Sequence, residues 1–374
     1  MNIYFFILNI QIIMKDNKFT KVLLYININK FIKIKTIIIF QYFLIIYLIY
    51  LIIKLRKKNY SFNDKNIYNS FNEYKDHNHF KLNEKELDYL NNKFAIIRIN
   101  CRTCALFSYY NRFLRCMHVF IKQGYIPIID LLSFPNILNN YNISSLKINP
   151  WELYFNQPYG YTLENVKRKA KTIKYYYCDS RLYEFPNKYN IIFNKALMDF
   201  WHNIAYSYVP IKNEILKEAN IIMKNLFKGS NNILGVLVRG TDYISIKPKG
   251  HPIQPELSQI FNDIKKMNKK NSYDWIFLAT EDDIIKKKFI FNFGDKLKYL
   301  NNINKIDYNY KQKNFLVYNR NIKFDYNFFK LYLLNIIIMS KCIDIICSCT
   351  NGTIGVFIFT EGFRNNKIYW FGLY

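Results

Sequence analysis

The sequence predicts an α/β protein with two doubly wound parallel sheets. Short apolar runs typical of buried strands alternate with stretches whose apolar residues recur at helical spacing. The boundaries between these stretches are marked by Gly124, Gly229 and Pro255. Glycine often follows the end of a helix, and proline is common in the first turn of a helix. Because the alternation continues through both halves, we expect one domain over residues 93–228 and another over 229–374.

The first half begins with a strand–helix–strand unit. The apolar runs 94–99 (FAIIRI) and 125–129 (YIPII) predict buried strands, and helical spacing over 106–121 predicts a helix between them. Asp130 lies at the carboxyl end of the second strand. The segment 149–166 is turn-rich and aromatic, and its pattern leaves two interpretations open, a lid or simple packing.

The second half continues the same alternation. Apolar runs predict strands over 233–238, 275–279, 343–347 and 367–371. A helix over 211–228 ends the first domain. In the second domain, helices are expected over 255–270, 327–342 and 353–361, and one more begins after residues 280–283.

The chain is strongly basic. Its 374 residues include 54 Lys and Arg against 27 Asp and Glu, a net charge of +27. A hydrophobic share of 51% excludes a mainly disordered chain. The surplus of lysine accompanies a surplus of Asn, Ile, Tyr and Phe, as A+T-rich codons produce, so a solvated surface explains it. Attraction to anionic lipid, nucleic acid or a phosphorylated substrate is the alternative. Because the charge forms no single block, we expect no nucleic-acid partner.

The cysteines are odd in number, so they cannot all pair within the chain. We expect mostly free thiols, as in a long intracellular enzyme. Cys101 and Cys104 have zinc-ligand spacing, but they lie far in sequence from Cys347 and Cys349, so no metal site is expected. The seven cysteines are Cys101, Cys104, Cys116, Cys178, Cys342, Cys347 and Cys349.

Residues 36–53 (TIIIFQYFLIIYLIYLII) predict a single transmembrane helix. The run is 18 residues long and uncharged, long enough to cross a bilayer with little tilt, although a buried core helix is the alternative. It follows an N-terminal tail over 1–35 and precedes a polar stem over 54–92. The denser basic cluster follows the run, at Lys54, Arg56, Lys57 and Lys58, which favours a membrane-tethered body on the cytoplasmic side.

The strand 233–238 runs directly into Arg239, Gly240, Thr241 and Asp242. Ligands of open α/β sheets bind beyond the carboxyl ends of the strands. A guanidinium there can hold a phosphate with two hydrogen bonds, and a glycine lets the backbone approach a ligand. Asp242 could orient the arginine, bind a sugar hydroxyl or accept a proton. The alternative is a surface turn with an Arg–Asp ion pair.

Three further segments carry polar residues near strand ends. Ser348, Thr350, Asn351, Gly352 and Thr353 follow a strand and open a helix, where amides and the helix dipole favour anions, although an ordinary helix cap is the alternative. Glu281 and Asp282 could bind a ribose or a base edge, or serve as favourable charges in a helix's first turn. His251 could act as a general base or be a structural loop histidine.

Missing motifs narrow the chemistry. The sequence has no GxxxxGK[ST] loop, no HExxH and no GxSxG elbow, which argues against P-loop hydrolases, zinc proteases and serine hydrolases. It also has no Asp-x-Asp pair to cradle a metal-bound nucleotide sugar. If a nucleotide sugar binds, we expect positive side chains and backbone amides in place of a metal, and no cofactor.

The motif 236–243 (VLVRGTDY) resembles the arginine motif of the α1,2-, α1,6- and protein O-fucosyltransferase superfamily. The segments 149–152 (NPWE), 155–158 (FNQP), 247–255 (KPKGHPIQP) and 371–374 (FGLY) resemble more narrowly its bacterial surface-polysaccharide glycosyltransferases. The ordered matches extend over roughly residues 94–374.

This resemblance implies a GT-B-like fold and inverting, metal-independent transfer of fucose or a related sugar from a GDP-sugar to a glycan or polysaccharide acceptor. Arg239 would contact the β-phosphate, and Asp242 would support it. Independently of the resemblance, His251 completes the candidate catalytic set, because its loop follows Asp242 and could supply a general base. The implied donor-binding residues are Arg239, Gly240, Thr241, Glu281, Asp282, Ser348, Thr350, Asn351, Gly352 and Thr353. The implied partners are a nucleotide sugar and a glycan acceptor, and the apolar segment 36–53 adds membrane lipid.

The chain departs from the family pattern at two places. Gly240 replaces a second motif arginine, and the often glycine-rich first-domain loop is Asn-Cys-Arg-Thr-Cys-Ala over 100–105. These departures leave open a transferase fold without activity. The net charge of +27 leaves open a second alternative, a non-catalytic basic membrane protein that binds anionic lipid or nucleic acid.

Overall fold

The computed structural model describes residues 87–101, 104–139, 148–178, 189–301 and 324–374. All of them belong to the compact unit Ile67–Tyr374, one of two units into which the chain divides. The predicted tail, the membrane segment 36–53 and most of the stem lie outside the described residues. None of the helices within the described ranges is both long and apolar enough to cross a bilayer.

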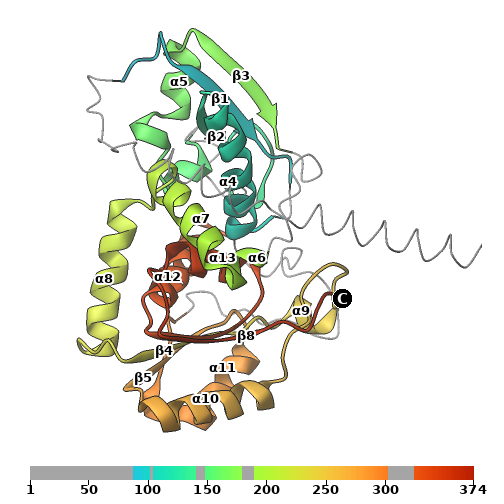
Figure 1. Cartoon of the computed structure of the whole chain (residues 1–374), viewed down its shortest axis with the longest axis vertical. Helices are drawn as coiled ribbons and strands as arrows, with labels where there is room; N and C mark the ends of the chain where they lie inside the picture. Colours follow the sequence, from blue (N-terminus) through green and yellow to red (C-terminus); the bar gives the residue numbers. More distant parts are fainter. Residues whose placement is uncertain (1–86, 102–103, 140–147, 179–188, 302–323) are drawn as a thin grey trace, which may run out of the picture. The chain divides into compact units, whose positions relative to one another are not determined.

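The first domain contains a parallel three-stranded sheet in the order β2-β1-β3 (Figure 1). Its strands are β1 (Lys93–Arg98), β2 (Ile126–Asp130) and β3 (Thr172–Tyr177). The amphipathic helix α4 (Leu106–Lys122) joins β1 to β2, which confirms the predicted strand–helix–strand unit. Strand β3 was not predicted. It is an edge strand with mostly exposed side chains, so its sequence lacks the apolar run that indicates a buried strand.

The segment 149–166 packs against β2. Trp151 and Phe155 are fully buried, which favours packing over a lid. The side-chain amides of Asn149 and Gln157 donate to the carbonyl of Ile129 at 2.7 Å and 2.8 Å. The Gln157 amide oxygen also accepts from Ile129 N at 3.0 Å, so side-chain amides cover this edge of the sheet as a neighbouring strand would.

The second domain contains a parallel five-stranded sheet in the order β6-β5-β4-β7-β8. Relative to chain order this is 3-2-1-4-5, so the direction of strand addition reverses between β4 and β7. Such a reversal leaves a crevice at the carboxyl ends of the two central strands. The strands are β4 (Ile233–Leu237), β5 (Trp275–Ala279), β6 (Leu297–Lys298), β7 (Asp344–Ser348) and β8 (Asn365–Tyr369).

The helices of this half agree closely with the predicted ones. The predicted helices correspond to α8 (Asn213–Phe227), α10 (Leu257–Asn271), α11 (Asp283–Phe293), α12 (Tyr326–Ser340) and α13 (Asn351–Phe359). In the first domain, α5 (Leu163–Lys169), α6 (Asn190–Phe193), α7 (Lys195–Tyr208) and the 3-10 turns Ile137–Asn139, Pro150–Leu153 and Pro158–Gly160 were not predicted. In the second domain, α9 (Asp242–Ser245) and the 3-10 turn Gly294–Lys296 were not predicted.

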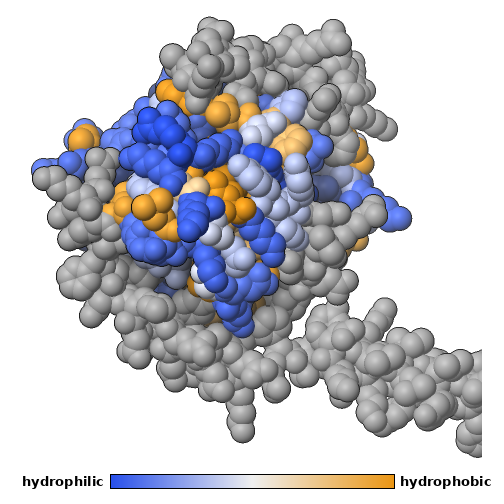
Figure 2. All heavy atoms as spheres, turned by 90° about the horizontal axis from the view of Figure 1, so that it is seen from above, coloured by the Kyte–Doolittle hydropathy of each residue, from blue (hydrophilic) through white to orange (hydrophobic). Residues whose placement is uncertain are grey.

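Helices α12 and α13 lie between the two sheets in Figure 1. Helix α13 is almost entirely buried, and a Cβ built at Gly355 would lie 3.0 Å from Cζ of Phe107 on α4. His202 on α7 approaches the carbonyl of Ile358 at 2.7 Å. One hydrophobic core therefore extends from α4 through α13 to the second sheet. On the face that Figure 2 shows, hydrophilic residues surround smaller apolar areas.

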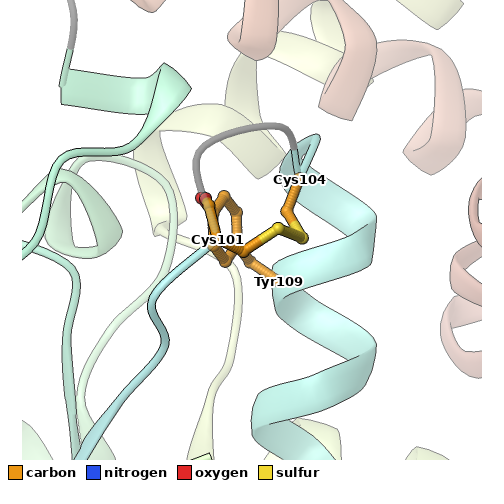
Figure 3. Close-up of a disulfide and its surroundings, with 3 residues drawn as sticks. All are labelled: Cys101, Cys104 and Tyr109. Atoms are coloured by element: carbon orange, nitrogen blue, oxygen red, sulfur yellow. A yellow bond between two sulfur atoms is a disulfide. The ribbon is translucent and has the colours of Figure 1, made fainter. Parts of the chain in front are cut away.

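The prediction of mostly free thiols is wrong, because four of the seven cysteines form disulfides. Cys101 pairs with Cys104 between β1 and α4 (Figure 3), and Cys116 on α4 pairs with Cys178 after β3. The second pair is 62 residues apart in sequence, and the unpredicted strand β3 brings its partner to α4. Cys342, Cys347 and Cys349 are free and buried. No group of three or more metal-ligating side chains occurs among the described residues.

A buried carboxylate fixes the amino ends of β7 and β8. Asp344 accepts hydrogen bonds from Arg364 Nη2 at 2.6 Å and Asn365 N at 2.7 Å, and from the hydroxyl of Tyr273. Burial alone would raise the pKa of Asp344, but the bonds from Arg364, Tyr273 and Asn365 outweigh it and hold the pKa below its usual value.

We predict that Asp344→Asn flattens the acid side of the stability curve. The pKa of Asp344 is lowered on folding, so its stabilising effect is present above about pH 4 and is lost as the pH falls through the folded-state pKa. Urea unfolding of the full chain measures this from pH 7 to pH 2. The variant should be about 2 kcal/mol less stable than the wild type at pH 7, and this difference should shrink as the pH falls. Asp295→Asn, which removes an exposed carboxylate, is the control, and equal acid losses in all three proteins would contradict the prediction.

Candidate active site

The candidate site lies at the carboxyl ends of β4 and β7, where the strand order reverses. Arg239 follows β4 and Thr350 follows β7, so the parallel sheet brings two segments more than a hundred residues apart to one edge. Arg239, Glu281, Thr350, Asn351 and Gly352 line one pocket there. Leu237, Tyr243, Ala279 and Thr280 of the second domain also line it. The rest of the wall comes from the first domain, from Phe324 and from α12: Ala105, Phe107, Ser108, Ile137, Phe324, Asn327, Phe328, Phe329, Leu331, Tyr332, Asn335 and Ile336.

Arg239 is held by two carboxylates. Its Nη2 lies 2.8 Å from Asp242 Oδ1, and its Nη1 lies 3.1 Å from Glu281 Oε1. The guanidinium also lies over the Tyr243 ring, 4.9 Å from its centroid. Burial alone would lower the pKa of Arg239, but the charges of Glu281 and Asp242 outweigh burial and raise it. The guanidinium is therefore permanently charged, and a quarter of its side chain is exposed at the pocket.

The turn after Arg239 is strained. Thr241 has φ 48° and ψ −119°, a left-handed conformation that a β-branched residue rarely adopts and that costs on the order of 1–3 kcal/mol. Its N–H donates to Asp282 Oδ2 at 3.1 Å. Its hydroxyl lies within donating distance of both Asp242 Oδ1, at 3.1 Å, and Glu281 Oε1, at 3.0 Å, and these two oxygens share its single proton. The same carboxylates that hold Arg239 therefore also hold the strained turn.

Gly240 is required by packing inside the protein. A Cβ at this position would lie 2.7 Å from Cβ and 2.8 Å from Cγ of Asp282. Its N–H donates to Glu281 Oε1 at 3.0 Å. Gly240 was predicted to let the backbone approach a ligand. In the structure, the side chain of Asp282 fills the space next to Gly240 instead.

Glu281 and Asp282 divide their roles. Glu281 lines the pocket, and burial raises its pKa while the charge of Arg239 opposes the rise. Asp282 is buried and caps α11, accepting from Ile284 N at 2.9 Å and Ile285 N at 3.1 Å. For Asp282, the helix-cap interpretation therefore describes the observed contacts.

In the loop after β7, some predicted residues line the pocket and others only hold the loop in place. Thr350 caps α13 by accepting from Thr353 N at 3.0 Å, and it lines the pocket with Asn351 and Gly352. Thr353 donates to the carbonyl of Ser348 at 2.5 Å, and Ser348 donates to Gln254 at 2.5 Å. Within the described chain, Ser348 and Thr353 are not among the pocket-lining residues, so they position the loop from behind.

His251 lies behind Tyr243 and is not among the described residues that line the pocket. Its ring packs edge-on against Tyr243, 5.2 Å between centroids, and its Nδ1 lies 3.3 Å from the carbonyl of Lys249. Its backbone pairs with the C-terminal residues, since Tyr374 N donates to the His251 carbonyl at 3.0 Å. The structural-loop interpretation fits these contacts, and a role as general base has no contact to support it.

Sequence reasoning missed the contribution of α12 and the start of α4. Tyr332 is partly buried and interacts with the charges of Arg239 and Glu281, and desolvation raises its pKa. A Cβ at Gly352 would lie 2.6 Å from its hydroxyl oxygen, so that glycine leaves room for Tyr332. The signal was present in the sequence: Asn327 and Asn335 recur at helical spacing in an otherwise mostly apolar helix, and both line the pocket.

Comparison with known proteins finds no matching family model and no matching curated protein. Solved structures that resemble the chain include POFUT1 in complex with GDP, at 9% identity and TM-score 0.40, over 75% of this chain and 99% of that one. They also include the α-1,6-fucosyltransferase NodZ soaked with GDP-fucose, at 14% identity and TM-score 0.39, over 72% and 93%. NodZ from Bradyrhizobium matches at 12% identity and TM-score 0.38, over 71% and 92%.

These structures include fucosyltransferases, the superfamily that the motif residues resemble. The identities and TM-scores are too low to carry an argument about this chain. The proposal that follows therefore depends on the geometry around Arg239.

We predict that Gly240→Ala disrupts the turn. The added methyl group displaces Asp282, which weakens its bond to Thr241 N and its cap on α11. We expect a loss of roughly 1–3 kcal/mol in the free energy of unfolding, the usual range for overpacking. Chemical denaturation of the full chain measures this, with Lys249→Ala in the exposed part of the following loop as the control. A variant as stable as the wild type would show that Asp282 does not occupy this space.

Proposed function

We propose that the chain is a glycosyltransferase of GT-B type that transfers fucose or a related sugar from a GDP-sugar to a glycan acceptor. The observation that carries the proposal is the meeting of Arg239 with the capped start of α13 in one pocket at the strand reversal. An inverting reaction without a metal agrees with this set of groups, because a guanidinium and backbone amides supply oriented hydrogen-bond donors for a diphosphate.

The physical reason lies in the leaving group. Transfer from a GDP-sugar develops negative charge on the departing diphosphate, and fixed positive groups stabilise that charge most in the transition state. Asp242 and Glu281 fix the orientation of Arg239 before a ligand arrives. A guanidinium has more N–H donors than these two carboxylates engage, so some remain for phosphate oxygens. The positive end of the α13 dipole adds to the same field.

The two carboxylates also limit this charge. The carboxyl groups of Asp242 and Glu281 pair with Arg239 and offset its positive charge, so the trio has no positive excess. Gly240, where the family pattern has a second arginine, adds none. We infer that phosphate binding here depends more on oriented donors than on net charge, and that Asp242 positions Arg239 rather than taking part in proton transfer.

We propose that the protein is anchored by the segment 36–53. Two features disagree on the side of the membrane. The denser basic cluster that follows the segment, at residues 54–58, favours a body on the cytoplasmic side. The two disulfides favour an oxidising compartment instead. Because buried Cys116 forms a pair inside the packed first domain, we propose the oxidising side.

We predict that Arg239→Ala weakens GDP binding about 10- to 100-fold, the effect of losing charge-assisted hydrogen bonds of roughly 1.5–3 kcal/mol. Isothermal titration of the full chain with GDP, UDP, CDP and ADP measures this. Arg239→Lys keeps the charge but loses the paired N–H donors of the guanidinium, so its GDP affinity should lie between those of the wild type and the alanine variant. It also provides a second test in case the alanine variant does not fold. Arg168→Ala, an exposed arginine on α5, is the matched control.

Two results would contradict the proposal. One is unchanged GDP affinity in both Arg239 variants that are shown to be folded. The other is equal binding of all four nucleotides that falls steeply with salt, which a merely basic surface produces.

A further inference from the structure

The two disulfides differ in their accessibility and place. Cys116 is 1% exposed and lies in the middle of α4, where its bond to Cys178 connects the helix to the end of β3. Cys101 is partly exposed, whereas its partner Cys104 is only 5% exposed. This pair occupies the connection between β1 and α4, three residues apart (Figure 3).

The Cys101–Cys104 disulfide adjoins the pocket. Ala105 follows Cys104 directly, and Ala105, Phe107 and Ser108 all line the pocket. The hydroxyl of Tyr109 donates to the carbonyl of Cys101, which holds the end of the β1 connection against the first turn of α4. Phe107 meets the Tyr332 ring edge-on at 5.4 Å between centroids, on the side of the pocket that carries Arg239.

The surroundings of this pair suit thiol exchange. Cys101 is the partly exposed residue of the pair and Cys104 is buried, so an incoming thiolate is expected to attack Cys101. The leaving thiolate then forms on Cys104, just before the N-terminus of α4, where the helix dipole stabilises a negative charge. Ala105 provides no side-chain cap, and the first turn of α4 contains no acidic residue to oppose that charge.

We propose that Cys101–Cys104 is a thiol–disulfide exchange site whose redox state sets the order of the pocket wall at the start of α4. A thiolate of a dithiol reagent attacks Cys101 Sγ, a mixed disulfide forms, and the bond to Cys104 breaks with its electron pair on Cys104 Sγ. The second thiol of the reagent then attacks the mixed disulfide. The reagent leaves as its own disulfide, and the two cysteines carry the two electrons and two protons that it has lost.

Reduction removes the covalent link that closes the β1–α4 connection. The described contacts that then hold this connection to α4 include the bond from Tyr109. The first turn of α4, which carries Phe107 and Ser108 into the pocket, should therefore open more often. The inference concerns a covalent site and a local opening, so it does not depend on which ligand the pocket binds.

The test exposes the native full chain to graded dithiothreitol and then to alkylation with isotopically different reagents before and after full reduction. Peptide mass spectrometry gives the reduced fraction of each pair. We expect Cys101–Cys104 to be reduced roughly tenfold faster than Cys116–Cys178 and to re-form with oxidised glutathione. Equal rates, or no reduction of Cys101–Cys104 before the protein unfolds, would overturn the proposal.

Hydrogen exchange tests the consequence for the pocket. In the wild type, reduction should speed exchange of the amides at the start of α4. The double variant Cys116→Ser/Cys178→Ser should keep this response, and Cys101→Ser/Cys104→Ser should exchange fast without any further response to reductant. A response retained in the second variant would assign the effect to the other disulfide, and slow exchange in every reduced protein would overturn the link to the pocket.

Discussion

The ion-paired position of Arg239 is the constraint on which the candidate site depends. Asp242 and Glu281 hold the guanidinium from two sides, and the same carboxylates bond to Thr241 in a conformation that a threonine rarely adopts. Asp282 completes the arrangement by accepting from the Thr241 amide while it caps α11. A strained residue held by this many bonds marks a place where the fold gives up stability for geometry.

The topology explains why this turn faces a pocket. In a parallel sheet of order 3-2-1-4-5, the connections after the two central strands leave toward opposite faces and open a crevice between them. The turn at Arg239 and the cap at Thr350 lie on the two sides of that crevice. Helix α12 and the start of α4 close it with mostly apolar side chains, and an apolar wall strengthens the interaction of a charged group with a fixed guanidinium.

Much of the fold could be predicted from periodicity, and less of the site could be. Apolar runs in the sequence indicate buried strands such as β5, but the exposed edge strand β3 has no such run. Motif positions showed which segments meet, but not which side chains face inward: Thr350 lines the pocket, whereas His251 does not. That distinction depends on side-chain contacts between distant segments. The disulfides were missed for the same reason, because the pairing of Cys116 with Cys178 depends on β3.

The measurement that tests the central claim most directly is a crystal structure of the full chain with GDP. The account predicts the β-phosphate within hydrogen-bond distance of the Arg239 fork and of the first amides of α13, with Asp242 and Glu281 still holding the guanidinium. A diphosphate bound elsewhere, or bound here through groups other than Arg239 and the start of α13, would contradict it.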